Sequence, residues 1–238
     1  MNVAESQQPS AYLNFNSFFT RALKPDARAV VNGMGDIACP VDGMVSEAGN
    51  ITAGRLFQAK GHYYSLASLV GGSQSLAGIF SDGTFATLYL SPRDYHRIHM
   101  PLGGTLLEMC YIPGRLYSVN QASTCYIPGL FTRNERVVTL FDTDAGPMGM
   151  VLVGALFVSG IETVWAGSIA RTSRGRFRCW DYRDEIEYPV KLKHGQEMGR
   201  FNMGSTVIVL FAAGRMSLDS AITAGSHIRF GERLGNYS

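Results

Sequence analysis

The sequence predicts a mainly β fold of the α+β class, with a β-barrel or sandwich-like domain and a short N-terminal helical arm. After Ala38 the apolar runs are short, rich in β-branched and aromatic residues, and bounded by Gly, Pro, Asn or Asp. The 27 glycines in 238 residues suit a fold with many tight turns. The longest stretch with helical spacing lies before this region.

The N-terminal arm is predicted from residues 10–25, where apolar residues recur at helical spacing and Pro25 ends the pattern. Two interpretations of this helix remain open. Its apolar side either packs on the domain or meets a membrane interface. We therefore divide the chain into an arm of residues 1–30, with polar residues at its start, and a domain of residues 31–238. The apolar positions of the arm helix are Ala11, Phe15, Phe18, Phe19, Ala22 and Leu23.

The domain is expected to consist largely of strands. The run from Met148 to Ile161 is interrupted by glycines and is expected to be a buried strand, and residues 64–71 predict a short helix. No run reaches the roughly 18 apolar residues that a spanning helix needs. The strand signals are GMVSEAG, TFATLYLS, GTLLEMCYIP, RVVTLFDT, MGMVLVGALFVSGIETVWAGSI and STVIVLFAAG.

Composition excludes several classes of protein. Apolar residues make up 46% of the chain and charged residues 17%, which is typical of a globular protein. A net charge of +2 does not favour a nucleic-acid partner. The N-terminus lacks the basic-then-apolar order of a secretory signal. The four cysteines are widely spaced and include no C-x-x-C pair, so we expect free thiols.

Two histidines lie three residues apart in YLSPRDYHRIHMP. His96 and His99 could be metal ligands, hydrogen-bonded histidines without a chemical role, or acid–base groups, because histidine titrates near neutral pH. Pro92 and Pro101 bracket the segment, and no third ligand is close in sequence. We therefore predict no metal site.

An aspartate and a serine occupy turn-like segments elsewhere. Asp42 precedes Gly43 and is either a turn residue or a carboxylate that orients a histidine. Ser205 follows Gly204 at the start of an apolar run and could be only a turn residue. With a base nearby, its hydroxyl could instead attack an external acyl group, as in a serine hydrolase, or the Gly204 carbonyl, as in a self-processing enzyme.

Several long segments, in order, resemble the bacterial phosphatidylserine decarboxylases. The resemblance runs from about Phe15 to Ala213, and Met203 stands where the L-G-S-T cleavage motif of that family has leucine. The segments that carry it are NSFFTRAL, PVDGMVSEAG, LFQAKGHYYSL, YLSPRDYHRIHMP, YIPGRLYSVN, LFTRNERVVTLFDT, GPMGMVLVGALFVSGIETVWAG and GQEMGRFNMGSTVIVLF.

The resemblance implies a proenzyme that cuts itself between Gly204 and Ser205. By carry-over, His99 takes the proton of Ser205 while Asp42 orients the imidazole ring. Ser205 then becomes a covalent pyruvoyl group at the head of a small chain, residues 205–238, and residues 1–204 form the large chain. No metal, pyridoxal phosphate or nucleotide is implied.

The resemblance also implies the reaction and its partners. Phosphatidylserine forms a Schiff base with the pyruvoyl group, loses carbon dioxide, and leaves as phosphatidylethanolamine. His96 is the candidate proton donor, and His62, Arg93 and Arg97 are candidate substrate-binding residues. The expected protein is a homodimer of two-chain protomers, peripherally bound at the cytoplasmic face of the inner membrane, with no nucleic-acid partner. Two alternatives remain: a serine hydrolase that uses Ser205, His99 and Asp42 without cleavage, and a non-enzymatic binding module.

Overall fold

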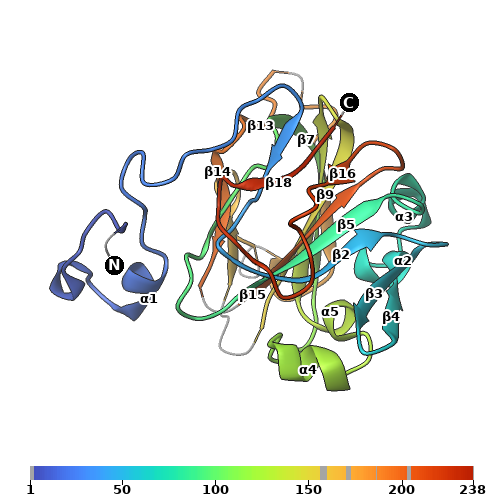
Figure 1. Ribbon diagram of the computed structural model, residues 1–238, viewed down its shortest axis with the longest axis horizontal. Helices are drawn as coiled ribbons and strands as arrows, with labels where there is room; N and C mark the ends of the chain where they lie inside the picture. Colours follow the sequence, from blue (N-terminus) through green and yellow to red (C-terminus); the bar gives the residue numbers. More distant parts are fainter. Residues whose placement is uncertain (1–2, 156–159, 170–172, 186, 203–204, 238) are drawn as a thin grey trace.

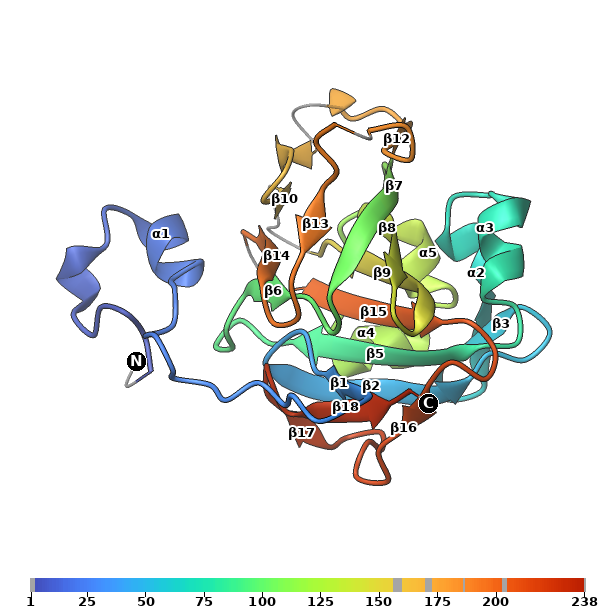
Figure 2. The same cartoon turned by 90° about the horizontal axis from the view of Figure 1, so that it is seen from above.

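The computed structural model describes residues 3–155, 160–169, 173–185, 187–202 and 205–237. The predicted mainly β fold is confirmed: 40% of the chain is strand and 13% is helix. Every pairing between named strands in the described residues is antiparallel. A β-sheet body carries the short helices α2–α5, and the N-terminal arm projects to one side of it (Figures 1 and 2).

The central sheet has nine strands within the described residues, in the order β12-β7-β8-β9-β15-β5-β2-β17, with β13 also paired to β7. Its middle strand, β15, has partners on both sides. The bounds are β2 Gly43–Asn50, β5 Thr84–Leu90, β7 Gly104–Ile112, β8 Arg136–Thr143, β9 Gly146–Val153, β12 Arg178–Asp181, β13 Lys191–Leu192, β15 Ser205–Phe211 and β17 His227–Ile228.

Three smaller sheets surround the central one. They have the orders β11-β10-β14-β6, β1-β18-β16 and β3-β4. Their strands are β1 Asp36–Ala38, β3 Arg55–Ala59, β4 His62–Ser65, β6 Arg97–His99, β10 Ile161–Thr163, β11 Gly167–Ser168, β14 Glu197–Phe201, β16 Ser217–Leu218 and β18 Arg233–Asn236.

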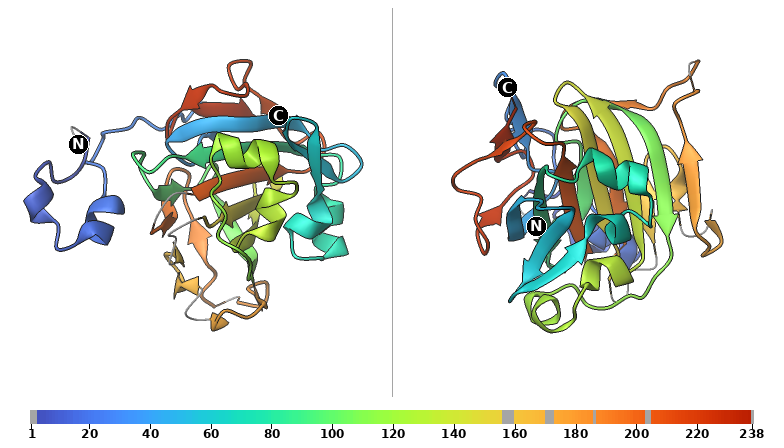
Figure 3. Two further views of the ribbon diagram at one scale, coloured as in Figure 1. Left: turned by 90° about the horizontal axis from the view of Figure 1, so that it is seen from below. Right: turned by 90° about the vertical axis from the view of Figure 1, so that its right-hand side faces the viewer.

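Both faces of β15 are buried, which makes the central sheet the middle layer of the body. Val207, Val209 and Phe211 pack into a core shared with β6, β10 and β14. Ile208 and Leu210 point to the opposite core, which the helices cover (Figure 3). Strand alternation explains this division, because successive side chains project to opposite faces. The helices are α2 Leu66–Leu69, α3 Gln74–Ile79, α4 Gln121–Tyr126 and α5 Leu130–Arg133.

The arm helix is shorter than its apolar spacing predicts. A 3₁₀ turn spans Pro9–Ala11, and α1 spans only Phe15–Phe19. Asn14 caps its first turn through a hydrogen bond from the Ser17 backbone amide. Beyond its other end, Arg97 Nε donates to the Thr20 carbonyl at 2.9 Å, and the Lys24 amide donates to the Val3 carbonyl at 2.9 Å.

The prediction of four free thiols is wrong for two of them. Cys110 on β7 and Cys179 on β12 form a disulfide across 69 residues of sequence. They stand directly opposite each other in the pairing of the two strands, which the spacing of cysteines in the sequence does not reveal. Cys39, which is buried, and Cys125, which is half-buried, are free thiols.

Arg136 of β8 links the helices to the central sheet through hydrogen bonds to backbone carbonyls. Its guanidinium donates to four backbone carbonyls at 2.7–2.8 Å, those of Ser68, Leu69, Thr132 and Asn134. Burial lowers the pKa of Arg136 to about 10, so the group stays charged at neutral pH. The charge is therefore dispersed over backbone dipoles from α2 and α5.

We predict that Arg136→Met lowers the free energy of unfolding by about 3 kcal/mol or more, because it leaves four carbonyls without their donor. Arg133→Met is the matched control, since Arg133 is exposed, and should change stability by less than about 0.5 kcal/mol. Urea unfolding followed by circular dichroism measures both. Equal losses in the two variants would contradict the assigned role.

Candidate active site

Ser205 is the first residue of β15 and is fully buried. It pairs with Leu90 at the end of β5, and strand alternation puts its side chain on the same side as Val207 and Val209. That side of the core contains β6 and β14. Gly204, the other half of the expected cleavage site, lies outside the described residues. The fold thus places the Ser205 hydroxyl on the side of the sheet that carries the two histidines.

His96 lies near the beginning of β15, as two backbone contacts indicate. Its Nε2 is 3.0 Å from the carbonyl of Ser91, which follows the Ser205 partner Leu90. Its own carbonyl accepts from the Phe201 amide at 3.0 Å, at the end of β14. His96 therefore bonds to the residue that follows β5 and to the last residue of β14.

The His96 ring is neutral and has a defined tautomer. A carbonyl can only accept, so Nε2 carries the hydrogen and Nδ1 carries the lone pair. Within the described part of the chain, Nδ1 is buried and has no hydrogen-bond partner. Burial lowers the pKa of His96 to about 4. Phe19 of the arm stacks on the ring with centroids 4.0 Å apart and contributes to this burial.

The His99 ring is also held in one tautomer. Its Nδ1 donates to the Gly195 carbonyl at 2.8 Å, so Nε2 has the lone pair and accepts from the Tyr95 hydroxyl at 2.9 Å. The Phe230 ring stacks on it at 3.7 Å. Burial lowers the pKa of His99, and the Gly195 bond and the Glu197 charge oppose that shift. At neutral pH the ring can accept a proton at Nε2.

Asp42 is near His99 and is bonded to other groups. One carboxylate oxygen pairs with Arg28 at 2.9 Å, and the other accepts from the Phe230 amide at 2.9 Å. Asp42 therefore fixes the residue whose ring stacks on His99. The carbonyl of Gly195, and not Asp42, accepts the hydrogen bond from His99 Nδ1 that orients the ring.

Two cavities meet beside these residues, since Tyr95 and Arg28 line both. One, of about 450 Å³, is rich in arginine and is lined in part by Arg21, Arg28, Arg93, Arg229, Asp42 and Asp94. The other, of about 320 Å³, reaches His99, Arg97, Glu197 and Phe230. Because guanidinium groups bind phosphate and carboxylate oxygens, the first cavity suits an anionic group.

The remaining candidate residues fall in different places. Arg93 lines the arginine-rich cavity. Arg97 lines the second cavity and is already paired with Glu197 at 2.8 Å. His62 begins β4 in the β3–β4 hairpin, at the other side of the body from β6 and β14 (Figure 2).

Sequence reasoning missed the groups that hold the two rings. They are Phe19 on His96, and Tyr95, Gly195 and Phe230 on His99. Tyr95 could have been suspected, because it is four residues before His99 in the same segment. The other three come from distant parts of the chain and have no local signal.

Comparison with known proteins identifies the family. The family model described as phosphatidylserine decarboxylase matches residues 15–236. The chain belongs to the phosphatidylserine decarboxylase family.

Curated relatives match this family member over nearly its whole length. The phosphatidylserine decarboxylase proenzyme of Pseudomonas aeruginosa strain LESB58 is 53% identical over 234 residues, which cover 98% of this chain and 81% of the relative. The Pseudomonas entomophila proenzyme is 53% identical with the same coverage. The Ectopseudomonas mendocina proenzyme is 52% identical over 236 residues, 99% of this chain and 82% of the relative.

The lowered pKa of His96 predicts a defined loss of stability in acid. Between its unfolded value of 6.5 and its folded value of about 4, the unfolded chain binds more protons, so stability falls as pH falls through this window. From pH 7 to 5 the loss from this residue is about 2 kcal/mol. His96→Gln, in a Ser205→Ala background that prevents the expected cleavage, should remove that part of the pH dependence.

Urea unfolding at pH 7 and pH 5 measures the effect. The control is His227→Gln, because His227 is exposed. If the free energy of unfolding of the His96 variant fell between pH 7 and pH 5 as much as that of its parent, the buried ring would not be a source of acid sensitivity.

Proposed function

We propose that this family member is a self-cleaving phosphatidylserine decarboxylase proenzyme. The observation that carries the proposal is the buried Ser205 hydroxyl at the head of β15, on the side of the sheet that holds the two histidines. The names of the relatives support the decarboxylase and proenzyme assignments. The proenzyme names favour a self-cleaving decarboxylase over a serine hydrolase that keeps its chain intact.

The surroundings of Ser205 fit a pyruvoyl group. In the described part of the chain the Ser205 hydroxyl is buried without a hydrogen-bond partner, which is an unfavourable state for a hydroxyl. Conversion to pyruvoyl removes that oxygen and leaves a methyl group, which an apolar site accommodates better. The pairing of β15 with Leu90 would hold the group in place. When present, it supplies an electrophilic ketone that draws electrons from the carbon losing carbon dioxide.

The two histidines have separate roles in this proposal. For processing, the Ser205 hydroxyl attacks the Gly204 carbonyl and gives its proton to the Nε2 lone pair of His99, which requires the Tyr95 hydroxyl to give up its bond to that atom. The Gly195 carbonyl orients the ring, and the Asp42 charge favours the protonated form. Asp42 thus acts through charge and through Phe230.

His96 would move protons during decarboxylation. Its neutral ring must gain a proton before it can donate one, because burial lowers its pKa to about 4. Nδ1, with its free lone pair, can take a proton from the incoming serine ammonium group and return one to the α-carbon. The arginine-rich cavity lined by Arg21, Arg28 and Arg93 would receive the substrate phosphate.

Cleavage need not release the small chain. Its strand β15 pairs with β5 and β9, β17 pairs with β2, and β18 pairs with β1, all of which belong to the large chain. The apolar residues from Val207 to Phe211 are fully or almost fully buried and are worth roughly 1.5–3 kcal/mol each. Residues 205–237 would therefore remain part of the fold after the cut.

Processing and turnover should respond differently to the two histidines. On a denaturing gel, wild-type protein should separate into two chains, and both Ser205→Ala and His99→Ala should remain in one piece. His96→Ala should be cleaved and yet lose decarboxylation of phosphatidylserine by about 100-fold or more. Release of carbon dioxide from vesicles measures turnover. Blocked cleavage in His96→Ala would contradict the separation of roles.

The membrane is the proposed location of the substrate. Among the described residues no helix is long and apolar enough to cross a bilayer. The arm exposes 98% of Leu13 and 61% of Phe15. The Arg21 guanidinium lies over the ring of Phe18, 5.2 Å from its centroid, and that ring contacts Phe15. An exposed apolar surface next to a cation suits a peripheral contact with anionic lipid. The cytoplasmic face of the inner membrane and a homodimer of two-chain protomers remain predictions.

Leu13→Ser combined with Phe15→Ser should reduce binding to phosphatidylserine vesicles by about 30-fold or more, because each side chain loses about 1 kcal/mol or more of apolar burial in the bilayer. Co-sedimentation with vesicles measures binding. Tyr188→Ser is the control, since Tyr188 is 81% exposed and lies outside the arm. Equal binding by wild type and the double variant would show that the arm does not contact the membrane.

A further inference from the structure

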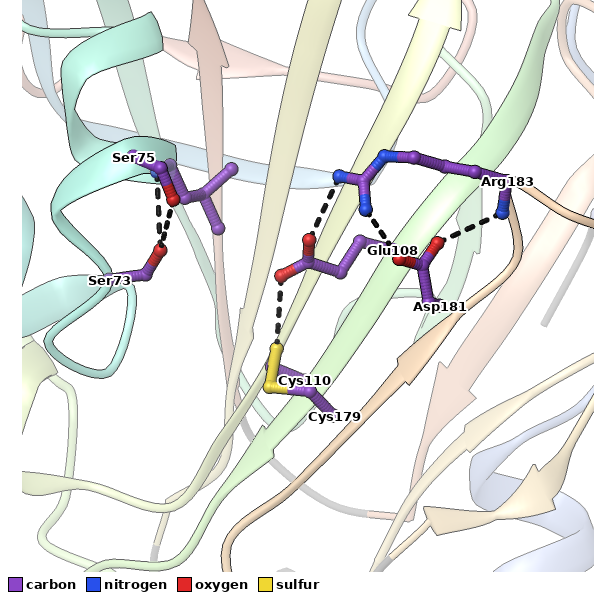
Figure 4. The surroundings of a disulfide bond; sticks show 8 residues. Ser73, Ser75, Glu108, Cys110, Cys179, Asp181 and Arg183 are labelled. Atoms are coloured by element: carbon purple, nitrogen blue, oxygen red, sulfur yellow. Dashed lines mark hydrogen bonds and ion pairs between the residues drawn. A yellow bond between two sulfur atoms is a disulfide. The ribbon is translucent and has the colours of Figure 1, made fainter.

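A group of metal-binding donor types lies at one edge of the central sheet. The sulfurs of Cys110 and Cys179 and a carboxylate oxygen of Glu108 lie within 4.8 Å of one another (Figure 4). In the structure the two sulfurs form a disulfide. Strands β8 and β9 separate this edge from β15, so the group is distinct from the Ser205 site.

Strand register places these donors on one face. Cys179 stands opposite Cys110, and Asp181 stands opposite Glu108, in the pairing of β12 with β7. Residues two apart on a strand share a face, so two cysteines and two carboxylates project together. Such a set of thiolate and carboxylate donors is of the kind that binds Zn²⁺.

Arg183 holds the two carboxylates. It pairs with Glu108 at 2.9 Å and with Asp181 at 2.7 Å. This leaves the second oxygen of Glu108 facing Cys110, at 3.4 Å from Sγ. A disulfide sulfur has no hydrogen to donate, so this is a contact between two electron-rich atoms. A cation placed between the Glu108 oxygen and the Cys110 sulfur would stabilise both.

We propose that reduction of the Cys110–Cys179 disulfide creates a Zn²⁺ site whose ligands are the two thiolates and Glu108. A phosphine or dithiol supplies the two electrons, and with two protons the S–S bond becomes two thiols. Zn²⁺ then displaces those two protons and forms two Zn–S bonds. Two thiolates, one carboxylate and Zn²⁺ sum to a charge of −1, which Arg183 beside Glu108 partly offsets. Water fills the fourth position.

Access favours this chemistry. Cys179 is exposed and belongs to an edge strand, so a reductant and a metal ion can both reach it. Cys110 is buried on β7, a strand that is paired with β12 on one side and with β8 on the other. Either form of the pair, disulfide or metal, links β12 to β7. The cysteine pair can therefore keep this edge together in oxidising and in reducing surroundings.

Cobalt binding tests the proposal, because Co²⁺ replaces Zn²⁺ and gives thiolate charge-transfer absorption in the near ultraviolet. After reduction with a phosphine and removal of the reductant, wild-type protein should bind one Co²⁺ per chain with this absorption. Cys179→Ser should lose the band, and Glu108→Gln should bind at least about tenfold more weakly. Cys125→Ser, which changes a free thiol elsewhere, should match wild type.

Oxidised wild-type protein is a second control, since it is folded and has no thiols at this position. It should bind no Co²⁺ with thiolate absorption. The proposal is overturned if reduced wild type shows no such band, or if the band persists in Cys179→Ser or in the oxidised protein. Circular dichroism verifies that each variant is folded.

Discussion

The site depends on one constraint, the complete enclosure of β15. This strand is paired on both sides and buried on both faces, and it begins at Ser205. Pairing with Leu90 fixes the register of Ser205 in the sheet, and strand alternation fixes the face of the sheet to which its side chain points. The same pairings would keep the small chain in place after a cut, so a single strand serves both the chemistry and the stability of the cleaved protein.

Burial determines the protonation of the site. Desolvation lowers the pKa of both His96 and His99, and a backbone carbonyl on one nitrogen of each ring leaves a lone pair on the other. The rings then differ in what meets that lone pair: Tyr95 at His99, and no described group at His96. This difference supports the proposed roles of His99 as a general base and of His96 as a proton shuttle.

Features encoded in contiguous residues could be predicted from the sequence. Short apolar runs bounded by turn-forming residues predicted the strands, and the resemblance pointed to Asp42, His96, His99 and Ser205. Features that depend on distant segments could not be predicted. The Gly195 carbonyl on His99 and the Cys110–Cys179 disulfide each join parts of the chain that meet only in the folded sheet. The arm helix was overestimated because its apolar spacing does not show that residues 22–24 bond to residues 3–5.

The central claim is that the enclosed serine becomes a ketone, and mass spectrometry of residue 205 tests it most directly. Protein purified under native conditions and shown to decarboxylate phosphatidylserine is denatured, treated with a hydrazide that captures ketones, and weighed. The account predicts two chains that co-purify, with the smaller one lacking the Ser205 nitrogen and bearing the hydrazide at its N-terminus. A fully active preparation made only of the intact 26.0 kDa chain, with unmodified serine at position 205, would contradict it.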